Sequence, residues 1–228
     1  MTKYNFLVSY DGTCYSGFQY QPDCKTIQGE LEKAFLEITE ESIRVIPAGR
    51  TDAGVHARAL PIQANLKKQM EPCDLKKALN ALLPESIRII SSEFCTDDDF
   101  HPRFSAISRT YRYYMSLRDN IFEERFYWKL KRALNCNAIK EVLPEFLGVN
   151  DFSSYSVGKY DNPLCTVYSI NFLNTLHDYM LEITANRFLH KMVRTIMGYL
   201  YQIGCGKRET RFYVAPACGL FLESVNYA

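Results

Sequence analysis

Segments typical of β-strands alternate along this chain with stretches in which apolar residues follow helical spacing, and the alternation occurs in both halves. Residues 4–10, YNFLVSY, are rich in aromatic and β-branched side chains and form the first expected strand. Further strands are expected at residues 44–46, 87–90, 111–117, 167–173, 179–185 and 219–227. Strands mixed with a few amphipathic helices predict an α/β or α+β fold in which helices cover one face of a sheet.

Helices are expected where apolar side chains recur every three or four residues. Thr26 is a candidate N-cap for the first helix, and Asp74 is expected to cap the second, which ends just before Pro84. Residues 138–147 could form a third helix, although Pro144 lies within them.

The clearest helical pattern covers residues 188–203, and Gly204 is expected to end that helix. The order of elements is similar before and after residue 121. The chain is therefore expected to divide into residues 1–120 and 121–228, as two halves of one continuous domain.

The composition is that of an ordinary globular protein. The chain has 228 residues, of which 47% are hydrophobic and 23% charged, so it can build a packed core and is not a disordered sequence. Its eight cysteines include no Cys-x-x-Cys pair and no Cys/His cluster with zinc spacing, which fits a reducing compartment. No signal peptide and no membrane-spanning apolar segment are visible, so a cytoplasmic location is expected.

The charges are distributed unevenly along the chain. The formal net charge is only +1, which taken alone argues against nucleic acid as a partner. However, residues 101–132 contain eight Lys or Arg against three Asp or Glu, and residues 185–211 contain six against one. These two basic stretches could build one positive face, or they could be two solvated surfaces without a partner.

The stretch AGRTDAGVHA, residues 48–57, combines two glycines with Arg, Thr, Asp and His directly after an expected strand. Gly49 and Gly54 allow backbone conformations and close approaches that other residues forbid. Such a loop can hold a carboxylate in a cleft, whereas the alternative is a plain Gly-rich turn with a solvated Asp. The stretch matches neither GxGxxG nor GxxxxGK[ST], so it is not a phosphate-binding loop.

AGRTDAGVHA resembles the active-site motif of the tRNA pseudouridine synthase A family. Other segments resemble further family motifs in the same order: DGTxYxGFQ at residues 11–19, RFSA at 103–106, RTYRY at 109–113, DFSS at 151–154, NRFLHKMVRxIxG at 186–198 and APAxGLFL at 215–222. The resemblance spans nearly the whole chain. It departs from the family between residues 207 and 215, where members usually carry a further helical segment.

The resemblance implies an α+β fold with a mixed, mainly antiparallel β-sheet. The sheet would be built from two similar ferredoxin-like halves, with helices on one face and an RNA-binding cleft on the other. The resemblance also implies a homodimer whose partner is tRNA. The substrate would be the anticodon stem-loop, at uridines on the 3′ side of the loop and in the adjacent stem.

The reaction implied by the resemblance is an isomerisation. Pseudouridine formation breaks the bond between uracil N1 and the ribose, turns the base and rejoins it through C5. It needs no redox cofactor and no metal, and none is expected here. By resemblance, Asp52 is the nucleophile. It either adds to the ribose carbon or assists loss of the base and captures the product, and the sequence leaves both routes open.

The resemblance assigns roles to four more side chains. Arg194 is expected to form a salt bridge with Asp52, because a carboxylate held out of water tends to be protonated and inert unless a cation lies near it. Tyr111 is expected to bind the substrate by stacking on the flipped uracil, and its hydroxyl could also move the C5 proton. Arg50 fits the position that fills the space left by the extruded base, and Arg103 fits a tRNA contact.

Two histidines lie in the matching motifs. His56 is interpreted as a hydrogen-bonded structural residue, and His190 has no assigned role.

Two other functions remain as alternatives. The chain could be a non-catalytic tRNA-binding or folding protein, but such a protein has no need for Asp52, Tyr111 and Arg194 together. It could also be a nucleobase glycosylase or a glycoside hydrolase, but these usually need two cooperating carboxylates and the loop offers one.

Overall fold

In the computed structural model, which describes residues 1–207 and 213–228, the chain falls into two compact units. One unit comprises residues 1–107 and 222–228, and the other comprises residues 108–221. The described residues form ten strands and four α-helices, and most neighbouring strands are antiparallel. This confirms the expected α+β class with a mixed, mainly antiparallel arrangement. The division at residues 120 and 121 stays a prediction.

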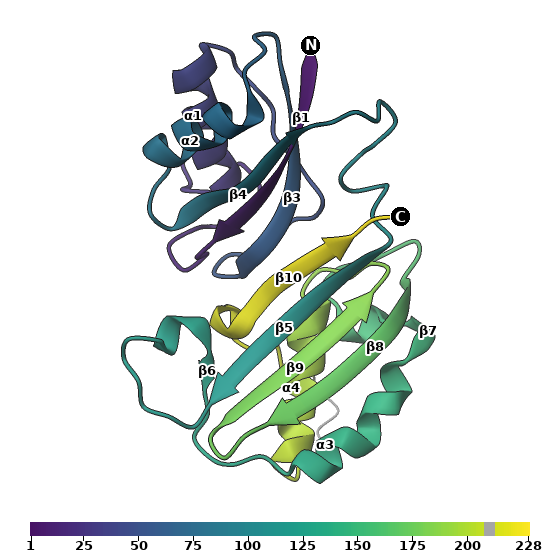
Figure 1. The fold of residues 1–228 in the computed structure, drawn as a ribbon. Helices are drawn as coiled ribbons and strands as arrows, with labels where there is room; N and C mark the ends of the chain where they lie inside the picture. Colours follow the sequence, from purple (N-terminus) through teal and green to yellow (C-terminus); the bar gives the residue numbers. More distant parts are fainter. Residues whose placement is uncertain (208–212) are drawn as a thin grey trace. The chain divides into compact units, whose positions relative to one another are not determined.

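The N-terminal unit is a small antiparallel sheet with two helices. Its strands are β1 (Thr2–Tyr10), β2 (Ile46–Pro47), β3 (His56–Leu66) and β4 (Ile87–Phe94). Strand β1 lies between β3 and β4 and is antiparallel to both, and β2 pairs with β3. Helices α1 (Ile27–Thr39) and α2 (Pro72–Leu82) lie together on one side of these strands (Figure 1).

The sequence pattern of β1 explains the core of this unit. Every second side chain from Tyr4 to Tyr10 is buried, because successive side chains of a strand point to opposite faces. Phe6 meets Phe35 of α1 edge to face, with ring centroids 5.5 Å apart. Thr26 caps α1 as expected, since its hydroxyl accepts a hydrogen bond from the backbone N–H of Gly29 at 3.2 Å.

The second unit is also a sheet backed by helices. Its strands are β5 (Ser108–Ser116), β6 (Trp128–Lys129), β7 (Gly148–Asp151), β8 (Leu164–Asn174) and β9 (Asp178–Ala185). The antiparallel order is β5-β9-β8-β7, and β6 pairs with β5 in parallel, which makes the arrangement mixed. Helices α3 (Cys136–Val142) and α4 (Met192–Gly204) lie behind these strands in Figure 1.

Short elements complete the chain. Strand β10 (Leu220–Asn226) begins in the second unit and ends in the first. Four 3₁₀ turns occur among the described residues, at Glu124–Phe126, Leu143–Phe146, Ser153–Tyr155 and Ala217–Gly219.

Several element boundaries differ from the sequence-based expectation. Helix α2 begins at Pro72, because proline has the backbone angle that a first helical turn needs, so Asp74 lies inside the first turn and the expected cap there is wrong. The stretch 138–147 is helical only to Val142, after which Pro144 lies in a 3₁₀ turn. Strand β2 covers Ile46–Pro47 rather than residues 44–46.

Helix α4 is shorter than expected at its start. It begins at Met192 instead of Phe188, because Lys191 takes a left-handed conformation with φ of 62° that breaks the helical path. Its end lies one residue later than expected, with Cys205 as the C-cap. Gly204 is the last helical residue, and the glycine with positive φ is Gly206, with φ of 74°.

Helix α4 is held against the segment that follows the undescribed residues by a close backbone approach. A Cβ atom on Gly198 would collide with the backbone carbonyl of Tyr213, so only glycine fits this point of the helix. One turn earlier, the backbone N–H of Ala215 donates to the carbonyl of Arg194 at 3.1 Å. The start of α4 and residues 213–215 therefore form one packed unit.

We predict that Gly198→Ala lowers the free energy of unfolding by at least about 1–3 kcal/mol, because the added methyl group forces the two backbones apart. Urea denaturation followed by circular dichroism measures the change. Gly49→Ala is the matched control, since a Cβ atom at Gly49 meets nothing within 4 Å. Equal stability of the two variants would show that the helix and residues 213–215 can separate at little cost.

Candidate active site

Asp52 is held by a tight turn in the N-terminal unit. It lies half-buried in the loop between β2 and β3, next to the buried side chain of Thr51. The backbone N–H of Val55 donates to the carbonyl of Asp52 at 3.2 Å, and Gly54 within this turn has φ of 77°. A β-turn with positive φ at its third residue favours glycine there, which explains why Gly54 follows the Asp at this spacing.

The opening segment of the chain packs against this turn. The backbone N–H of Phe18 donates to the carbonyl of Thr51 at 3.1 Å, and that of Gly54 donates to the carbonyl of Tyr15 at 3.3 Å. A Cβ atom on Gly12 would collide with the carbonyl of Val55. Two motifs that lie about 40 residues apart are therefore one structural unit, in which residues 11–18 fix the backbone on both sides of Asp52.

A buried hydroxyl pair adds a side-chain link. The hydroxyl of Tyr10 lies 2.7 Å from that of Thr51, and the contact is buried. Tyr10 is the last residue of β1, so the hydrogen bond fixes the residue before Asp52 to the sheet. The sequence identified Tyr10 only as the end of a strand. A signal was present in the Thr of the motif, since a threonine directly before a catalytic candidate needs a partner when it is buried.

His56 completes the connection between the two motifs. Its side chain is fully buried at the start of β3, and its Nδ1 accepts the backbone N–H of Gly12 at 3.1 Å. A carboxylate oxygen of Asp11 lies 3.2 Å from the same nitrogen. Both neighbours belong to the opening turn, which supports the interpretation of His56 as a structural residue.

The two expected RNA contacts of this unit lie in different loops. Arg50 is exposed and belongs to the Asp52 loop itself. Arg103 is exposed and belongs to the connection between β4 and β5.

In the second unit, Tyr111 lies on β5 opposite Ile183 of β9. It shares a face of the strand with the buried Tyr113, because the two lie an even number of residues apart. The ring of Phe188 meets that of Tyr111 edge to face, with centroids 5.1 Å apart. Phe188 lies four residues before the start of helix α4.

Arg194 lies in the first turn of α4 and is half-buried. Its Nε donates to the carbonyl of Ala215 at 2.8 Å, and the hydroxyl of Tyr113 donates to the carbonyl of Pro216 at 2.7 Å. Burial raises the pKa of Tyr113 well above its ordinary value, and the charge of Arg194 opposes this rise. The guanidinium group, the phenol and the Ala215–Pro216 backbone therefore lie together.

Asn186 links two strands of the second sheet, and the sequence motif gave no sign of this role. Its carbonyl accepts a hydrogen bond from Arg109 at 2.7 Å, and its side-chain oxygen accepts the backbone N–H of Thr166 at 2.9 Å. It thus ties the strand that carries Tyr111 to β8. The motifs at 109–113, 186–198 and 215–222 meet in this unit, and the structure brings Tyr111 and Arg194 to the same group of elements.

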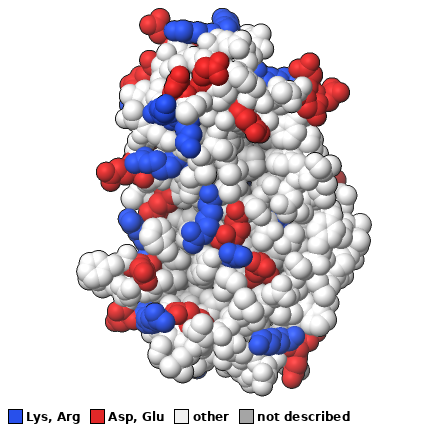
Figure 2. All heavy atoms as spheres, in the orientation of Figure 1, with Lys and Arg blue, Asp and Glu red and all other residues white. Residues whose placement is uncertain are grey.

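The first basic stretch, residues 101–132, includes paired charges. Arg112 lies 2.7 Å from Glu182, and Arg118 lies 2.9 Å from Asp178. Lys and Arg side chains are interspersed with Asp and Glu on the one face that Figure 2 shows. Arg208 and Arg211 of the second basic stretch lie outside the described residues. Most of the segment between residues 207 and 215, where family members usually carry a further helix, lies outside them as well.

Comparison with known proteins identifies the family. A family model described as tRNA pseudouridine synthase matches residues 7–105 and 142–214. Over its full length, the chain is 37% identical to tRNA pseudouridine synthase A of Thermosipho melanesiensis and 35% identical to that of Borrelia turicatae, and both relatives are covered completely. The chain belongs to the tRNA pseudouridine synthase family. The enzyme of Bacillus subtilis is 34% identical over 96% of this chain and 97% of its own length.

Membership of this family makes the chain a tRNA pseudouridine synthase, an isomerase, and confirms the family and activity expected from the motifs. The alignment with the Thermosipho enzyme runs over 245 positions, so that enzyme carries residues that this chain of 228 lacks. A solved archaeal box H/ACA sRNP Nop10–Cbf5 complex matches with a TM-score of 0.40 and 14% identity, over 95% of this chain and 46% of that chain. Likeness at that level supports no conclusion.

Two features are absent from the part of the chain that the structure describes. No group of three or more His, Cys, Asp or Glu in residues 1–207 and 213–228 could hold a metal ion. No helix in the same residues is long and apolar enough to cross a membrane.

We predict that Tyr10→Phe lowers the free energy of unfolding by about 1 kcal/mol and slows single-turnover pseudouridine formation, while tRNA affinity changes little. The reason is that the deleted hydroxyl releases Thr51 beside Asp52. Tyr20→Phe, at a half-exposed ring, is the control. Adding Thr51→Val to the unaltered enzyme and to the Tyr10→Phe variant gives the coupling energy between the two hydroxyls. A coupling energy near zero would mean that the hydroxyl pair does not hold the loop.

Proposed function

We propose that this tRNA pseudouridine synthase modifies uridines of the anticodon stem-loop, on the 3′ side of the loop and in the adjacent stem, with Asp52 as its nucleophile. The observation that supports Asp52 most strongly is the packing of residues 11–18 against its turn. Backbone carbonyls and amides on both sides of the turn are used to place one half-buried carboxylate, which is more order than a solvated surface Asp needs.

The chemistry then follows from the position of a single carboxylate. Asp52 either attacks the ribose carbon as uracil leaves, or assists loss of the base and then captures the product. In both routes the freed uracil turns within the site, and C5 displaces Asp52 from the ribose carbon, so the bond between the carboxylate and the ribose breaks. The C5 proton then leaves and N1 gains a proton, so no atom is lost overall and no cofactor or metal is consumed.

Arg194 supplies the cation for Asp52 in this proposal. Its Nε donates a hydrogen bond to the carbonyl of Ala215, so the closing segment, residues 213–216, orients the guanidinium group. Arg is suited to this role because it stays charged and can make a two-pronged contact with a carboxylate. Asp52 and Arg194 belong to different units, and their salt bridge stays a prediction.

Tyr111 receives the uracil in this proposal, and its surroundings limit where the base enters. Because Tyr111 shares a face with Tyr113 and contacts Phe188, the stacking surface lies on the side of the second sheet where α4 begins. The proposed stacking surface thus lies near the N-terminal end of α4, on the helix side of the sheet rather than on the opposite face that the resemblance implied. The hydroxyl of Tyr111 is the candidate for moving the C5 proton.

The proposed architecture is two ferredoxin-like halves, and the strand orders support it. In the first half, β1 pairs with both β3 and β4, and α2 connects these two neighbours. In the second half, β5 pairs with β9, and α4 connects β9 to β10. Each half therefore carries its principal site residue near a central strand.

The remaining parts of the proposal concern RNA binding and assembly. Arg50 fills the space left by the extruded uridine, and Arg103 holds tRNA phosphate, as the exposure of both side chains allows. The chain acts as a cytoplasmic homodimer in which one tRNA touches both subunits.

We predict that Asp52→Asn abolishes pseudouridine formation in an unmodified tRNA transcript, because the amide keeps the shape but has no negative charge for attack. A pseudouridine-specific chemical label measures turnover. A filter-binding assay measures tRNA affinity. The affinity should stay within about threefold, a change of under 1.4 kcal/mol, because the amide has the same shape as the carboxylate. Asp74→Asn on α2 is the control for loss of one negative charge. Turnover by the Asp52→Asn variant would reject Asp52 as nucleophile, and release of free uracil by the unaltered enzyme would indicate a glycosylase.

We predict that Arg194→Met reduces turnover by about 100-fold or more, because a preorganised charge beside the reacting group is removed. The lost hydrogen bond to Ala215 should cost only about 1 kcal/mol of stability. Arg194→Lys keeps the charge and should retain more activity than the Met variant. Equal turnover of the Met and Lys variants, both folded, would contradict the proposed role of the cation.

A further inference from the structure

Phe104 is a large aromatic side chain that the fold leaves in solvent. Its exposed fraction is 77%, and it belongs to the connection between β4 and β5. A single exposed apolar residue is common on protein surfaces and needs no explanation by itself. What sets Phe104 apart is the number of interactions that hold its backbone in place.

The loop around Phe104 is built on His101. The Nδ1 atom of His101 accepts the backbone N–H groups of Arg103 at 3.1 Å and of Phe104 at 3.3 Å. The backbone N–H of Ser105 donates to the carbonyl of His101 at 2.9 Å, and its hydroxyl accepts the N–H of His101 at 3.0 Å. These four hydrogen bonds close a compact turn with Phe104 near its tip.

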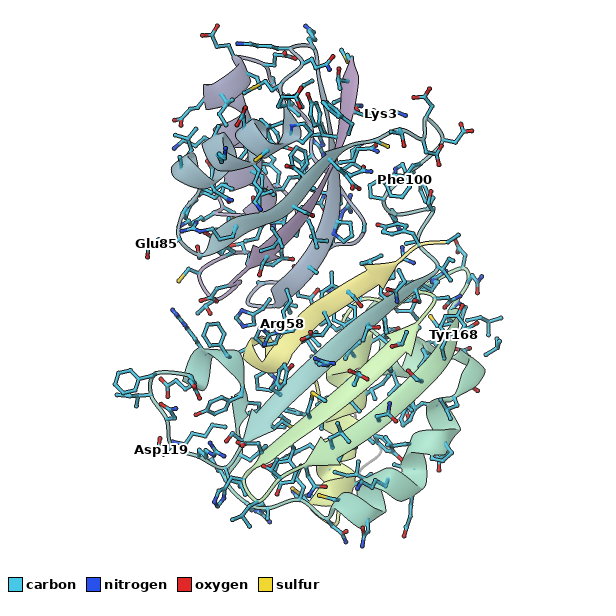
Figure 3. The ribbon with its side chains drawn as sticks, in the orientation of Figure 1. Lys3, Arg58, Glu85, Phe100, Asp119 and Tyr168 are labelled. Atoms are coloured by element: carbon cyan, nitrogen blue, oxygen red, sulfur yellow. The ribbon has the colours of Figure 1, made fainter. Side chains whose placement is uncertain are left out.

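The base of this turn is fixed to the N-terminal unit. Phe100, labelled in Figure 3, packs against Tyr227 with ring centroids 5.0 Å apart. The hydroxyl of Tyr227 donates to the carbonyl of Pro102 at 2.8 Å, and the N–H of Ile107 donates to the carbonyl of Asn226 at 2.9 Å. The ring of Phe104 is thus carried on a support that is anchored on both sides.

The groups around the ring are polar or cationic. The imidazole of His101 lies against it, with centroids 4.4 Å apart and planes tilted by 35°, and the guanidinium carbon of Arg103 lies 5.6 Å from its centre. These neighbours leave most of the ring surface open. A preset aromatic face beside a long cationic side chain is the combination with which proteins bind unpaired nucleobases and their phosphates.

We propose that Phe104 is a stacking platform for an unpaired nucleobase of the tRNA substrate, with Arg103 on the adjacent phosphate. The proposal rests on the proposed use of tRNA anticodon stem-loops, and it does not depend on Asp52 as nucleophile. Phe104 is a positioning residue here, since it holds the RNA while other groups act on the uridine.

The loop at residues 119–124 shows why nucleic acid fits Phe104 better than a protein surface. Phe122 in that loop is 84% exposed, but it adjoins the exposed Ile121 and is flanked by Asp119, Glu123 and Glu124. The negative charges of Glu123 and Glu124 beside this apolar pair disfavour phosphate, whereas Asp119 is paired with Lys129. Phe104 instead has the imidazole of His101 and the guanidinium group of Arg103 against its ring, and Phe122 is therefore a control for an exposed ring without such neighbours.

The experiment measures tRNA binding and turnover for Phe104→Ala, Phe104→Leu, Phe104→Tyr and Phe122→Ala in the full-length enzyme. Loss of base–aromatic stacking should weaken binding roughly 5- to 150-fold in the Ala and Leu variants, while the Tyr variant and Phe122→Ala should stay within about threefold of the unaltered enzyme. The slope of affinity against salt should be unchanged by Phe104→Leu and reduced by Arg103→Ala, because only the latter removes a phosphate contact.

A fluorescence measurement tests the stack directly. The chain has one tryptophan, Trp128, and Phe104→Trp adds a second. The emission of the variant minus that of the unaltered enzyme reports on residue 104, and this difference should be quenched when tRNA binds. Unchanged binding in the Leu variant, or a fall in oligomeric state in that variant by light scattering, would overturn the proposal, the second result indicating a contact between copies. An unaltered enzyme that neither binds nor modifies the anticodon stem-loop would instead overturn the proposed substrate.

Discussion

The site in the N-terminal unit depends on backbone hydrogen bonds between residues 11–18 and the turn that carries Asp52. A carboxylate on a free Gly-rich loop would sample many orientations, and fixing each backbone residue costs roughly 1–2 kcal/mol of conformational entropy. Here the carbonyls of Tyr15 and Thr51 and the close approach between Gly12 and Val55 offset that cost locally. Enzymatic rate depends on such preset geometry more than on the strength of any one contact.

In the second unit, backbone contacts between segments distant in sequence likewise hold a candidate site residue. Helix α4 and residues 213–216 are joined by hydrogen bonds in both directions between Arg194 and Ala215, and by the space that Gly198 leaves. Tyr113 joins the central strand to the same segment through Pro216. In each unit a side chain with a proposed function is thus oriented by a segment distant in sequence. If the proposed roles hold, substitution of a packing residue disturbs catalysis as well as stability.

The parts of the structure that could be predicted were those set by local pattern. The alternation in β1 and the cap at Thr26 depend on residues close together in sequence, and both have the predicted local conformation. The left-handed Lys191 and the pairing of Tyr10 with Thr51, 41 residues apart, depend on packing that no local pattern records. The cap expected at Asp74 failed because Pro72 offered a better start two residues earlier. The roles of Asp52, Tyr111 and Arg194 came from resemblance, and their chemistry stays a proposal.

The phenol of Tyr113 has a consequence for how the enzyme responds to alkali. Burial raises its pKa in the folded chain well above the ordinary value of 10.0, so the folded state holds this proton more tightly than the unfolded chain does. Its contribution to stability is complete below about pH 10 and is lost only as the pH rises further. Burial likewise raises the pKa of Tyr155 to about 12. Through the neutral range both phenols stay protonated, and Tyr113 remains a donor to Pro216. This link between β5 and the backbone of residues 215–216 therefore persists through the neutral range and is exposed to titration only in strong alkali.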